Sequence, residues 1–331
     1  MPKTYLAKAM EATQGQSPQS LRGLFDQAAK KVIAAREVLA RIVKDCVAEA
    51  ASYLVEELED LIPGQVRIST TPIHRDDEEA AGRADPGAVH QDNTEDGTIT
   101  EGTVRFDILF TLHLPGVEPI LLIINVEIQN RQTLPYPLKS RAVDYACRLV
   151  SRQGVDYGNF SKVYSIWIVT DPQEDKLANT TETLVIAERK EDGSLQPASE
   201  DAGLFEVQLL YLGEPEENLG TSLHRMLDII FTTQMGVEDK KKQLAALFDL
   251  QTTDEVSENM ENILNTELAL ETRATARANA LAEARAEKKS RENVQRMLEM
   301  GMQPDQIAHA LAETEDYVKE IRDQMQPGEA S

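Results

Sequence analysis

Alternating apolar and mixed positions between residues 104 and 129 form the clearest pattern in the chain. The even-numbered positions from Phe106 to Leu114, and again from Ile120 to Ile128, are all apolar. A period of two is typical of β-strands. A short segment with two prolines and one glycine separates the two runs. We therefore predict a β-hairpin with one apolar face and one mixed face.

The loop of this hairpin indicates its register. If Leu114 pairs with Ile120, Asp107 lies directly opposite Glu127, with Cβ atoms roughly 4.5–5.5 Å apart. A slip by one residue would move the apolar side chains to the mixed face, so the alternating pattern disfavours such a slip. A slip by two residues keeps the same faces and stays open. Gln129 lies two residues beyond Glu127 and therefore shares its strand face.

Helix and strand patterns on both sides of the hairpin predict an α/β fold. Residues 17–62 contain many good helix formers and few breakers before Pro63-Gly64, so we predict that they are helical. This order of elements predicts a mixed sheet with helices on its faces. The other core elements are a helix at 136–153, strands at 162–169 and 205–212, and, within 171–203, a short strand and a turn at Asp192-Gly193.

The last third of the chain, from about residue 217, is predicted to be helical. Residues 267–300 are rich in Ala, Glu and Arg, which is typical of a long exposed helix or a coiled coil. The final segment resembles a small helix-turn-helix, with Pro304 in a first turn and Thr314 as a helix cap. Acidic side chains on its second helix argue against phosphate contact and favour packing or self-association into a homo-oligomer.

An acidic segment interrupts the predicted core. Residues 75–102 hold nine acids against Arg75 and Arg83 and contain too little apolar surface to offset the entropy of ordering. We predict a mobile surface loop, and a role as a lid stays open. The predicted segments are an N-terminal helical part of the core at 1–74, the acidic flexible loop at 75–102, the α/β core at 103–216, a helical extension at 217–300 and a helix-turn-helix-like segment at 301–331.

Composition and charge limit the classes of function that the chain can have. The chain has 331 residues, 41% of them hydrophobic and 27% charged, as in ordinary globular proteins. It has no run of about 18 apolar residues and no apolar N-terminal stretch, so we expect neither membrane association nor secretion. With only Cys46 and Cys147, a reducing cytoplasmic location is favoured. The net charge of −23 disfavours non-specific attraction to nucleic acid, although divalent cations and a local basic patch can override it.

The opposed pair Asp107 and Glu127 is the candidate chemistry. Carboxylates that face each other on neighbouring strands repel unless a cation, a proton or a basic side chain lies between them. Carboxylate oxygens, completed by water and substrate phosphate, suit Mg²⁺, and Gln129 can orient an attacking water or a phosphate oxygen. The reaction that such a pair suggests is metal-assisted phosphodiester hydrolysis. Spacing alone favours the alternative, two solvent-facing carboxylates at strand ends, because paired acids are common.

A resemblance to a known family adds to this hypothesis. The blocks TEGTVRFDILF, EPILLIINVEIQN, YPLKSRAVDYACRLVSRQ and KVYSIWIV, in that order, resemble the PD-(D/E)XK nuclease family transposases, which are related to the recombination-promoting nucleases. The resemblance is strong over about residues 100–170 and loose over the rest of 20–250. It implies a restriction-endonuclease-like α/β core, DNA as the substrate and Mg²⁺ as the cofactor, with Mn²⁺ as a substitute. The implied catalytic residues are Asp107, Glu127 and Gln129, the first two as metal ligands.

Two departures from the superfamily pattern matter. The broad superfamily carries Lys where this chain has Gln129, and Gln brings no positive charge to stabilise a transition state. The E-x-Q form is nevertheless usual in the subgroup that this chain resembles. The superfamily also often uses an acid from the first helix, for which Glu56, Glu57 and Glu59 are candidates that no motif separates.

Basic residues around the predicted helix at 136–153 form the candidate DNA-binding surface. Residues 130–162 hold six basic side chains against two aspartates, a local surplus in an acidic chain. Arg141 suits a scissile phosphate because guanidinium binds phosphate through two hydrogen bonds, but a salt bridge to Asp144 is equally open. The candidate residues are Arg131, Arg141, Tyr145, Arg148 and Arg152, of which Tyr145 is favoured as packing.

Two hypotheses of function therefore stand. In the first, the chain is a magnesium-dependent DNA endonuclease, linked by its resemblance to transposition or recombination. In the second, a nuclease-like fold has lost catalysis and binds DNA or protein. The complete Asp107, Glu127 and Gln129 set favours the enzyme, whereas the net charge and the missing Lys favour the binding module.

Overall fold

The chain forms two compact units, Met1–Leu268 and Ala269–Ser331. The computed structural model describes residues 3–64, 66–68, 95–98, 102–116, 120–130, 136–154, 159–172, 175–199, 202–213 and 220–325. Candidate residue Arg131 and most of the acidic segment 75–102 lie outside these ranges. The boundary between the units falls within one long helix, whereas the sequence analysis placed segment boundaries after residues 216 and 300.

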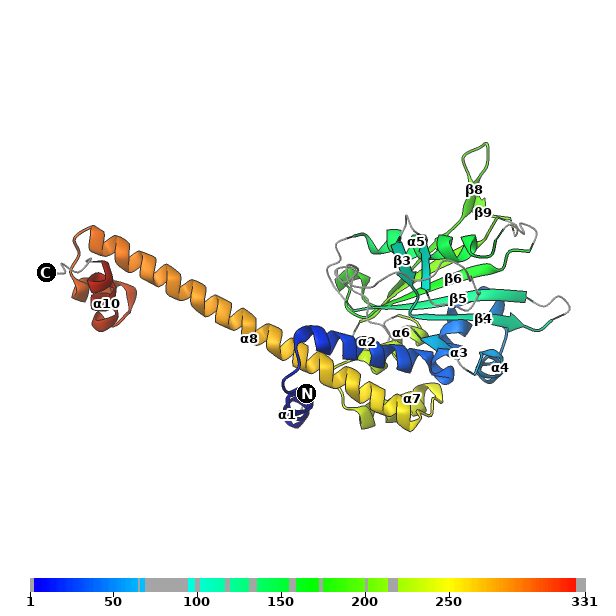
Figure 1. Cartoon of the computed structure of the whole chain (residues 1–331), viewed down its shortest axis with the longest axis horizontal. Coiled ribbons are helices and arrows are strands. Elements are labelled where there is room, and N and C mark those ends of the chain that lie inside the picture. Colours follow the sequence, from blue (N-terminus) through cyan, green and yellow to red (C-terminus); the bar gives the residue numbers. More distant parts are fainter. Residues whose placement is uncertain are drawn as a thin grey trace. The chain divides into compact units, whose positions relative to one another are not determined.

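A mixed six-stranded sheet, in the order β1-β4-β5-β6-β10-β7, is the centre of the first unit (Figure 1). β5, β6 and β10 run parallel, and the outer pairs are antiparallel. The α/β class with a mixed, helix-flanked sheet is therefore confirmed. The strands of this sheet are β1 (Arg67–Ile68), β4 (Ile108–Leu114), β5 (Ile120–Gln129), β6 (Lys162–Val169), β7 (Thr180–Val185) and β10 (Phe205–Tyr211).

The predicted hairpin is β4 and β5, and its register is confirmed. Leu114 pairs with Ile120, and the ladder continues to Ile108 opposite Val126. The predicted alternation is wrong at Phe106, which packs with the residues of the opposite sheet face. The chain bends at Asp107, and the preceding β3 (Gly102–Arg105) pairs with β2 (Glu95–Thr98) in a separate two-stranded sheet. Because the strand is interrupted at this bend, the alternation of side chains between the two sheet faces does not extend from β4 back to Phe106.

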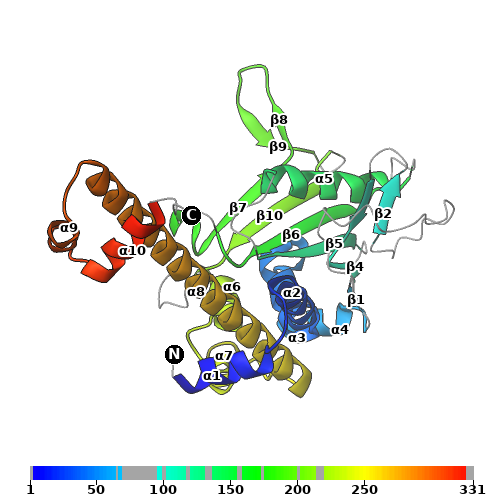
Figure 2. The same cartoon turned by 60° about the vertical axis from the view of Figure 1, so that its left-hand side comes forward.

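Helices cover both faces of the sheet (Figure 2). The region predicted as one helix at 17–62 is helical but broken at Ala35 and Val47, whose backbones are extended. Neither break has a proline or glycine signal, because the turns are set by packing against the sheet rather than by local propensity. The helices of the first unit are α1 (Lys3–Ala12), α2 (Pro18–Ala34), α3 (Arg36–Cys46), η1 (Ala48–Ala50), α4 (Val55–Leu61), α5 (Leu138–Ser151), η3 (Asp175–Leu177), α6 (Ser222–Phe231), α7 (Val237–Phe248) and the first part of α8 (Asp254–Glu299).

Two apolar clusters fill the space between the sheet and these helices. The larger packs α2, α3 and α6 against the even-numbered side chains of the hairpin, including Ile108 and Ile124. The smaller packs α5 against the other face, where Trp167 is 1% exposed and lies with Tyr145 and Leu209. Aromatic and aliphatic burial of this kind provides most of the stability of such layers.

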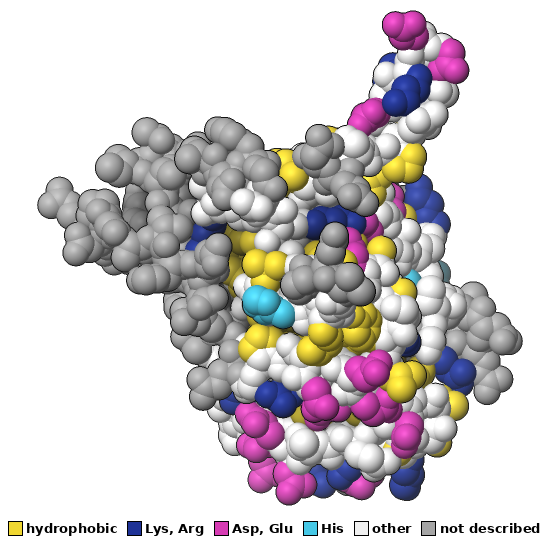
Figure 3. Space-filling model, turned by 90° about the vertical axis from the view of Figure 1, so that its right-hand side faces the viewer, with side chains coloured by type: hydrophobic (Ala, Val, Ile, Leu, Met, Phe, Trp, Pro, Cys, Tyr) yellow, Lys and Arg dark blue, Asp and Glu magenta, His cyan; other side chains and the backbone are white. Residues whose placement is uncertain are grey.

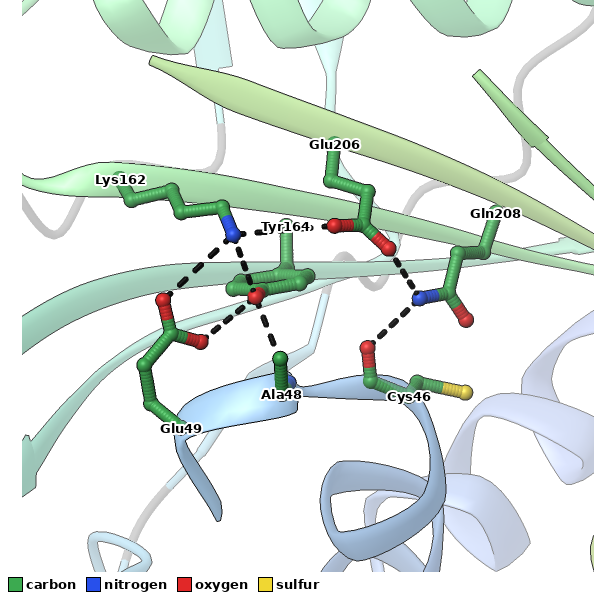
Figure 4. Close-up of polar contacts among 7 residues, drawn as sticks. All are labelled: Cys46, Ala48, Glu49, Lys162, Tyr164, Glu206 and Gln208. Carbon is green, nitrogen blue, oxygen red and sulfur yellow. Dashed lines mark hydrogen bonds and ion pairs between the residues drawn. The ribbon is translucent and has the colours of Figure 1, made fainter. Parts of the chain in front are cut away.

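A polar network ties η1 and the end of α3 to the sheet on the face of the larger cluster (Figure 4). The Tyr164 hydroxyl donates to Glu49 at 2.5 Å and accepts from Lys162 at 2.7 Å. Gln208 donates to the Cys46 carbonyl at 2.6 Å. Burial, with Asp45 and Glu206 nearby, raises the pKa of the Cys46 thiol, so it stays protonated at neutral pH. The geometry indicates a structural clamp because its polar groups satisfy one another.

The link between β7 and β10 forms a projecting hairpin of β8 (Ala187–Arg189) and β9 (Leu195–Pro197), visible at the top of Figures 1 and 3. Its turn contains Gly193 with a φ of 84°, which confirms the predicted Asp192-Gly193 turn. Asp192 accepts a hydrogen bond from the Ser194 amide at 2.9 Å, the usual way in which Asp stabilises a turn. Charged side chains of both signs cover this hairpin in Figure 3.

A fully buried lysine on α7 makes a testable contribution to stability. The Lys240 ammonium donates to the Ile230 carbonyl at 2.8 Å, and burial lowers its pKa to about 7. Between that value and the unfolded value of 10.5, the unfolded chain binds more protons, so stability rises with pH across this window. We expect Lys240→Met to stabilise the protein by about 2 kcal/mol at pH 7 and to remove this dependence, measured by urea unfolding from pH 6 to 10.

The matched control for this prediction is Lys242→Met on the same helix. The Lys242 side chain is 77% exposed. Its removal should change the free energy of unfolding by less than about 0.5 kcal/mol at every pH. If Lys240→Met instead lowers stability at pH 7, the hydrogen bond to Ile230 outweighs the cost of burying the ammonium.

The second unit has a small core of its own. The end of α8 packs with α9 (Pro304–Leu311) and α10 (Glu315–Met325) around Val294, Ile307, Val318 and Ile321. Pro304 begins α9, and the Thr314 hydroxyl accepts from the Tyr317 amide at 3.3 Å, so both predicted helix signals are confirmed. Of the helices in the described ranges, none combines the length and apolar character required to span a lipid bilayer.

Candidate active site

The carboxyl ends of β5 and β6 position the candidate residues. Glu127 pairs with Trp167, and Gln129 pairs with Val169, at the last residues of two parallel strands. The carboxyl ends of parallel strands are the usual place for ligand sites in α/β proteins, because chains leave the sheet there. Asp107 lies immediately before β4 and so reaches the same end of β5. The fold therefore brings together the three residues that the sequence analysis selected.

Two hydrogen bonds link Asp107 to Glu127 and Ile128 of β5. The Asp107 amide donates to Glu127 Oε1 at 3.0 Å, and the Ile128 amide donates to Asp107 Oδ2 at 3.0 Å. Asp107 is 7% exposed and Glu127 is 2% exposed. The alternative of two solvent-facing carboxylates is therefore wrong. Each carboxylate keeps further lone pairs for another partner, because a carboxylate can accept about four hydrogen bonds.

Helix α2 adds two charged residues that the sequence analysis did not select. Lys30 Nζ lies 2.8 Å from Asp107 Oδ1 and 2.7 Å from Asp26 Oδ2. The Lys30 side chain is 2% exposed, so this ammonium is buried between two acids. A signal was present in the sequence: Lys30 lies among buried apolar positions of α2, four residues after Asp26. The next residue, Lys31, is exposed, so the sequence by itself does not separate the buried lysine from its neighbour.

The first-helix acids considered from sequence lie elsewhere. Glu57 accepts from the Leu54 amide at 2.7 Å and caps α4, and Glu59 lies 3.5 Å from Arg41. The neighbouring Tyr53 hydroxyl donates to Pro115, at the loop end of the hairpin and so at the opposite end of β4 from Asp107. Acidic side chains gather low on the face shown in Figure 3. In the described part of the chain, the acid that approaches Asp107 from the N-terminal helices is Asp26.

Arg141 approaches Glu127 from α5 on the other side of the sheet. Its guanidinium donates to the Tyr136 hydroxyl at 2.9 Å and to the Tyr145 hydroxyl at 2.7 Å. It also lies 5.3 Å from the centre of the Trp167 ring. Asp144 accepts instead from Arg148 at 3.1 Å, so the alternative salt bridge from Arg141 to Asp144 is not formed.

The other helix residues proposed for DNA binding play different local roles. Tyr145 is 5% exposed and packs edge-on against Phe106 and Trp167. Burial, and then the charge of Glu127, raise its pKa, so its hydroxyl stays protonated. Arg152 lies 5.7 Å from the centre of the Phe106 ring. Among the candidate DNA-binding residues on α5, Arg141 therefore lies beside the acid pair.

Burial makes the charge state of Glu127 sensitive to a cation. Desolvation, and then the charge of Asp107, raise the pKa of Glu127 well above its usual value, against the lowering effect of Arg141. Burial and the charge of Asp107 also raise the pKa of Asp26, against Lys30. A carboxylate held in this way takes up a proton unless further positive charge arrives. Positive charge close to Glu127 therefore favours its ionised form, as Arg141 already does.

Polar groups continue beyond Glu127 along the strand. Gln129 is 7% exposed, and its carbonyl accepts from the Thr170 amide at 3.0 Å. The next residue, Asn130, donates to Glu267 at 2.6 Å and accepts from the Thr170 hydroxyl at 2.9 Å. These contacts hold the end of β5 against β6 and against α8 at Glu267. The backbone that carries Gln129 is thus fixed on both sides.

The donor set fits a small hard cation. Asp107 and Glu127 supply carboxylate oxygens, and one or two carboxylates completed by water and phosphate are typical of Mg²⁺ sites. Within the described residues, no group of three or more His, Cys, Asp or Glu side chains forms a metal cage. A complete protein cage, as for structural zinc, would require such a group.

Comparison of the chain with protein-family models, with curated proteins and with solved structures found no match. The function of the chain is therefore inferred from the chemistry of this site.

Proposed function

We propose that this chain is a metal-dependent DNA endonuclease of the PD-(D/E)XK type, with a restriction-endonuclease-like core acting in the cytoplasm. Mg²⁺ is the proposed cofactor, with Mn²⁺ as a substitute, and Asp107 and Glu127 are its proposed ligands. Gln129 is the proposed orienting residue, and the α5 surface is the proposed DNA contact. The C-terminal helices are proposed to mediate self-association.

One observation carries the proposal. Two buried carboxylates, Asp107 and Glu127, are held together at the carboxyl end of β5 and have cationic side chains on both sides. Burying charged groups is costly, and apolar residues of similar volume would often be more stable. A sequence that keeps such a cluster at the usual ligand end of a sheet is therefore best explained by function.

The roles of the residues follow from their positions. The bound metal supplies Lewis acidity to a phosphoryl oxygen and lowers the pKa of a water. Asp107 and Glu127 hold that ion, and the Ile128 and Asp107 amides fix their carboxylates. Arg141, held by two tyrosines, presents a guanidinium that suits a phosphate anion. The amide of Gln129 orients a water or a phosphate oxygen, and the surrounding aromatic residues limit access of bulk water.

A second candidate function is favoured by one specific contact. Lys30 already provides a positive partner for Asp107. A core in which this ion pair permanently replaces the metal would retain the fold and bind DNA or protein without cleavage. The two functions differ in whether divalent metal changes what the protein does to DNA.

Cleavage of supercoiled plasmid tests the proposal. Purified protein is incubated with Mg²⁺, Mn²⁺ or EDTA, and nicked and linear products are measured on gels. We expect nicking that requires metal and falls at least about 100-fold in Asp107→Ala and in Glu127→Ala. Glu56→Ala is the matched control, because Glu56 is an exposed acid on α4. Absence of cleavage, or cleavage that survives both site variants, would favour the binding module.

A further inference from the structure

Lys30 is the least expected residue of the site. Its ammonium lies between Asp26 and Asp107, at 2.7 and 2.8 Å, with the side chain 2% exposed. Although burial alone would lower its pKa, the charges of Asp107 and Asp26 raise it above the usual lysine value, so the residue remains charged. The acid cluster thus contains a positively charged side chain that comes from α2 and not from the hairpin.

Packing against the apolar core does not explain why position 30 is a lysine. On α2, Lys30 lies beside Ile33, at the edge of the apolar face that also carries Phe25 and Ala29 and belongs to the larger apolar core. An apolar side chain at position 30 would continue that face at no cost in desolvation, were it not for the two acids. The ion pair and the acids must therefore be explained together.

The charges of the cluster balance when a cation and a phosphodiester are added. Three carboxylates, from Asp26, Asp107 and Glu127, face two cations, Lys30 and Arg141. When all are ionised, one net negative charge remains. One divalent cation and one phosphodiester then bring the cluster to neutrality. Without Lys30, the same cluster would already be neutral once a divalent cation is bound, so a phosphodiester would leave it with one net negative charge, and the cation would be held more tightly.

We propose that Lys30 is a positioning residue that supplies, from α2, the positive charge that the uncharged Gln129 does not supply from β5. It fixes the Asp107 carboxylate and sets the charge of the cluster so that one divalent cation and one phosphate are accepted together. This inference rests on the proposed nuclease function for its effect on cleavage. Its effect on metal affinity is independent of cleavage.

Mn²⁺ affinity and plasmid nicking together test the proposal on the full chain. In Lys30→Met, loss of one positive charge beside Asp107 should raise Mn²⁺ affinity at least about tenfold, measured by calorimetry. Nicking should fall at least about 100-fold. Lys31→Met is the matched control, because it removes the same charge from the exposed side of α2 and should leave both readouts unchanged. Unchanged affinity and cleavage in Lys30→Met would overturn the proposal.

Relocation of the charge separates this role from a structural one. Gln129→Lys in the Lys30→Met background should bring Mn²⁺ affinity back towards the wild-type value and recover at least about tenfold in nicking. A purely structural Lys30 would give no recovery, and that result would overturn the proposal. If wild-type protein does not nick DNA but the affinity changes occur, the nuclease function fails while the role of Lys30 in cation loading stands.

Asp26→Asn keeps the inference testable if Lys30→Met does not fold. This variant is nearly isosteric and removes one acid while retaining the ion pair of Lys30 with Asp107. We expect Mn²⁺ affinity to fall at least about fivefold, opposite in sign to Lys30→Met. The loss of stability should be well below ~3 kcal/mol, because the Asp26 side chain is 28% exposed and the more buried partner of Lys30, Asp107, is kept. Unchanged or increased affinity in Asp26→Asn would contradict a shared charge balance.

Discussion

Glu127→Gln is expected to stabilise the protein while it abolishes DNA cleavage. The wild-type carboxylate is buried and lies beside Asp107, which together raise its pKa well above the usual value. Glutamine keeps the oxygen that accepts from the Asp107 amide but carries no charge to desolvate. We expect the free energy of unfolding to rise by about 0.5–2 kcal/mol at pH 8 in EDTA and cleavage to fall at least about 100-fold.

The sign of this effect depends on pH. Below the unfolded value of about 4.5, Glu127 is protonated in both states and the variant gains nothing. Above it, the folded protein binds more protons at this group than the unfolded chain does, so wild-type stability falls as pH rises to the elevated folded pKa. The advantage of the variant should therefore grow from pH 4.5 upwards. If the variant is less stable than the wild type at pH 8 in EDTA, the ionised Glu127 side chain does not destabilise the folded protein, and this prediction is wrong.

Asp107→Asn provides the matched contrast. It also removes a proposed metal ligand, so cleavage should again be lost. Here, however, the substitution deprives Lys30 of the partner at 2.8 Å and leaves it with Asp26 alone. We expect a loss of about 3 kcal/mol in unfolding free energy, because an incompletely paired buried charge is costly. The same chemical change at two neighbouring acids thus has opposite effects on stability.

Arg141→Met is expected to have the second large effect, on both stability and DNA binding. The guanidinium is held by two tyrosine hydroxyls and by the Trp167 ring, and its charge opposes that of Glu127. Its removal leaves a buried acid without this cation, so we expect a loss of about 3 kcal/mol by urea unfolding. DNA affinity measured in EDTA-free buffer should fall at least about tenfold, because a phosphate contact is lost.

Two further variants make this prediction specific. Lys139→Met is the control on the same helix, because the Lys139 side chain is 51% exposed and its ion pair with Glu182 contributes less than about 1 kcal/mol. In a double-mutant cycle, Glu127→Gln should reduce the stability cost of Arg141→Met, since the two charges interact. Additive effects would show that Arg141 acts through packing alone.

Local patterns were sufficient for the hairpin and its acid pair. The period of two and the short loop predicted the register that places the end of β4 beside Glu127, because any slip by one residue exposes apolar side chains. The strand at β6 and the Arg141–Tyr145 neighbours on α5 followed from equally short-range spacing. The sequence alone therefore predicted that Asp107 lies beside Glu127 and that Gln129 follows on the same strand, whereas the catalytic and metal-binding roles of these residues stay predictions.

Only the tertiary structure decided how that site is neutralised. Asp26 and Lys30 are about 80 residues from Asp107, and their own helix carries no motif that marks them. The breaks in α2–α4 and the bend at Asp107 likewise have no local signal, since each depends on packing that forms after the chain collapses. Hydrophobic periodicity reports which side of an element is buried but not which distant charge meets it there. The physical reason is that a charge pair in a low-dielectric interior depends on three-dimensional distance, not on sequence spacing.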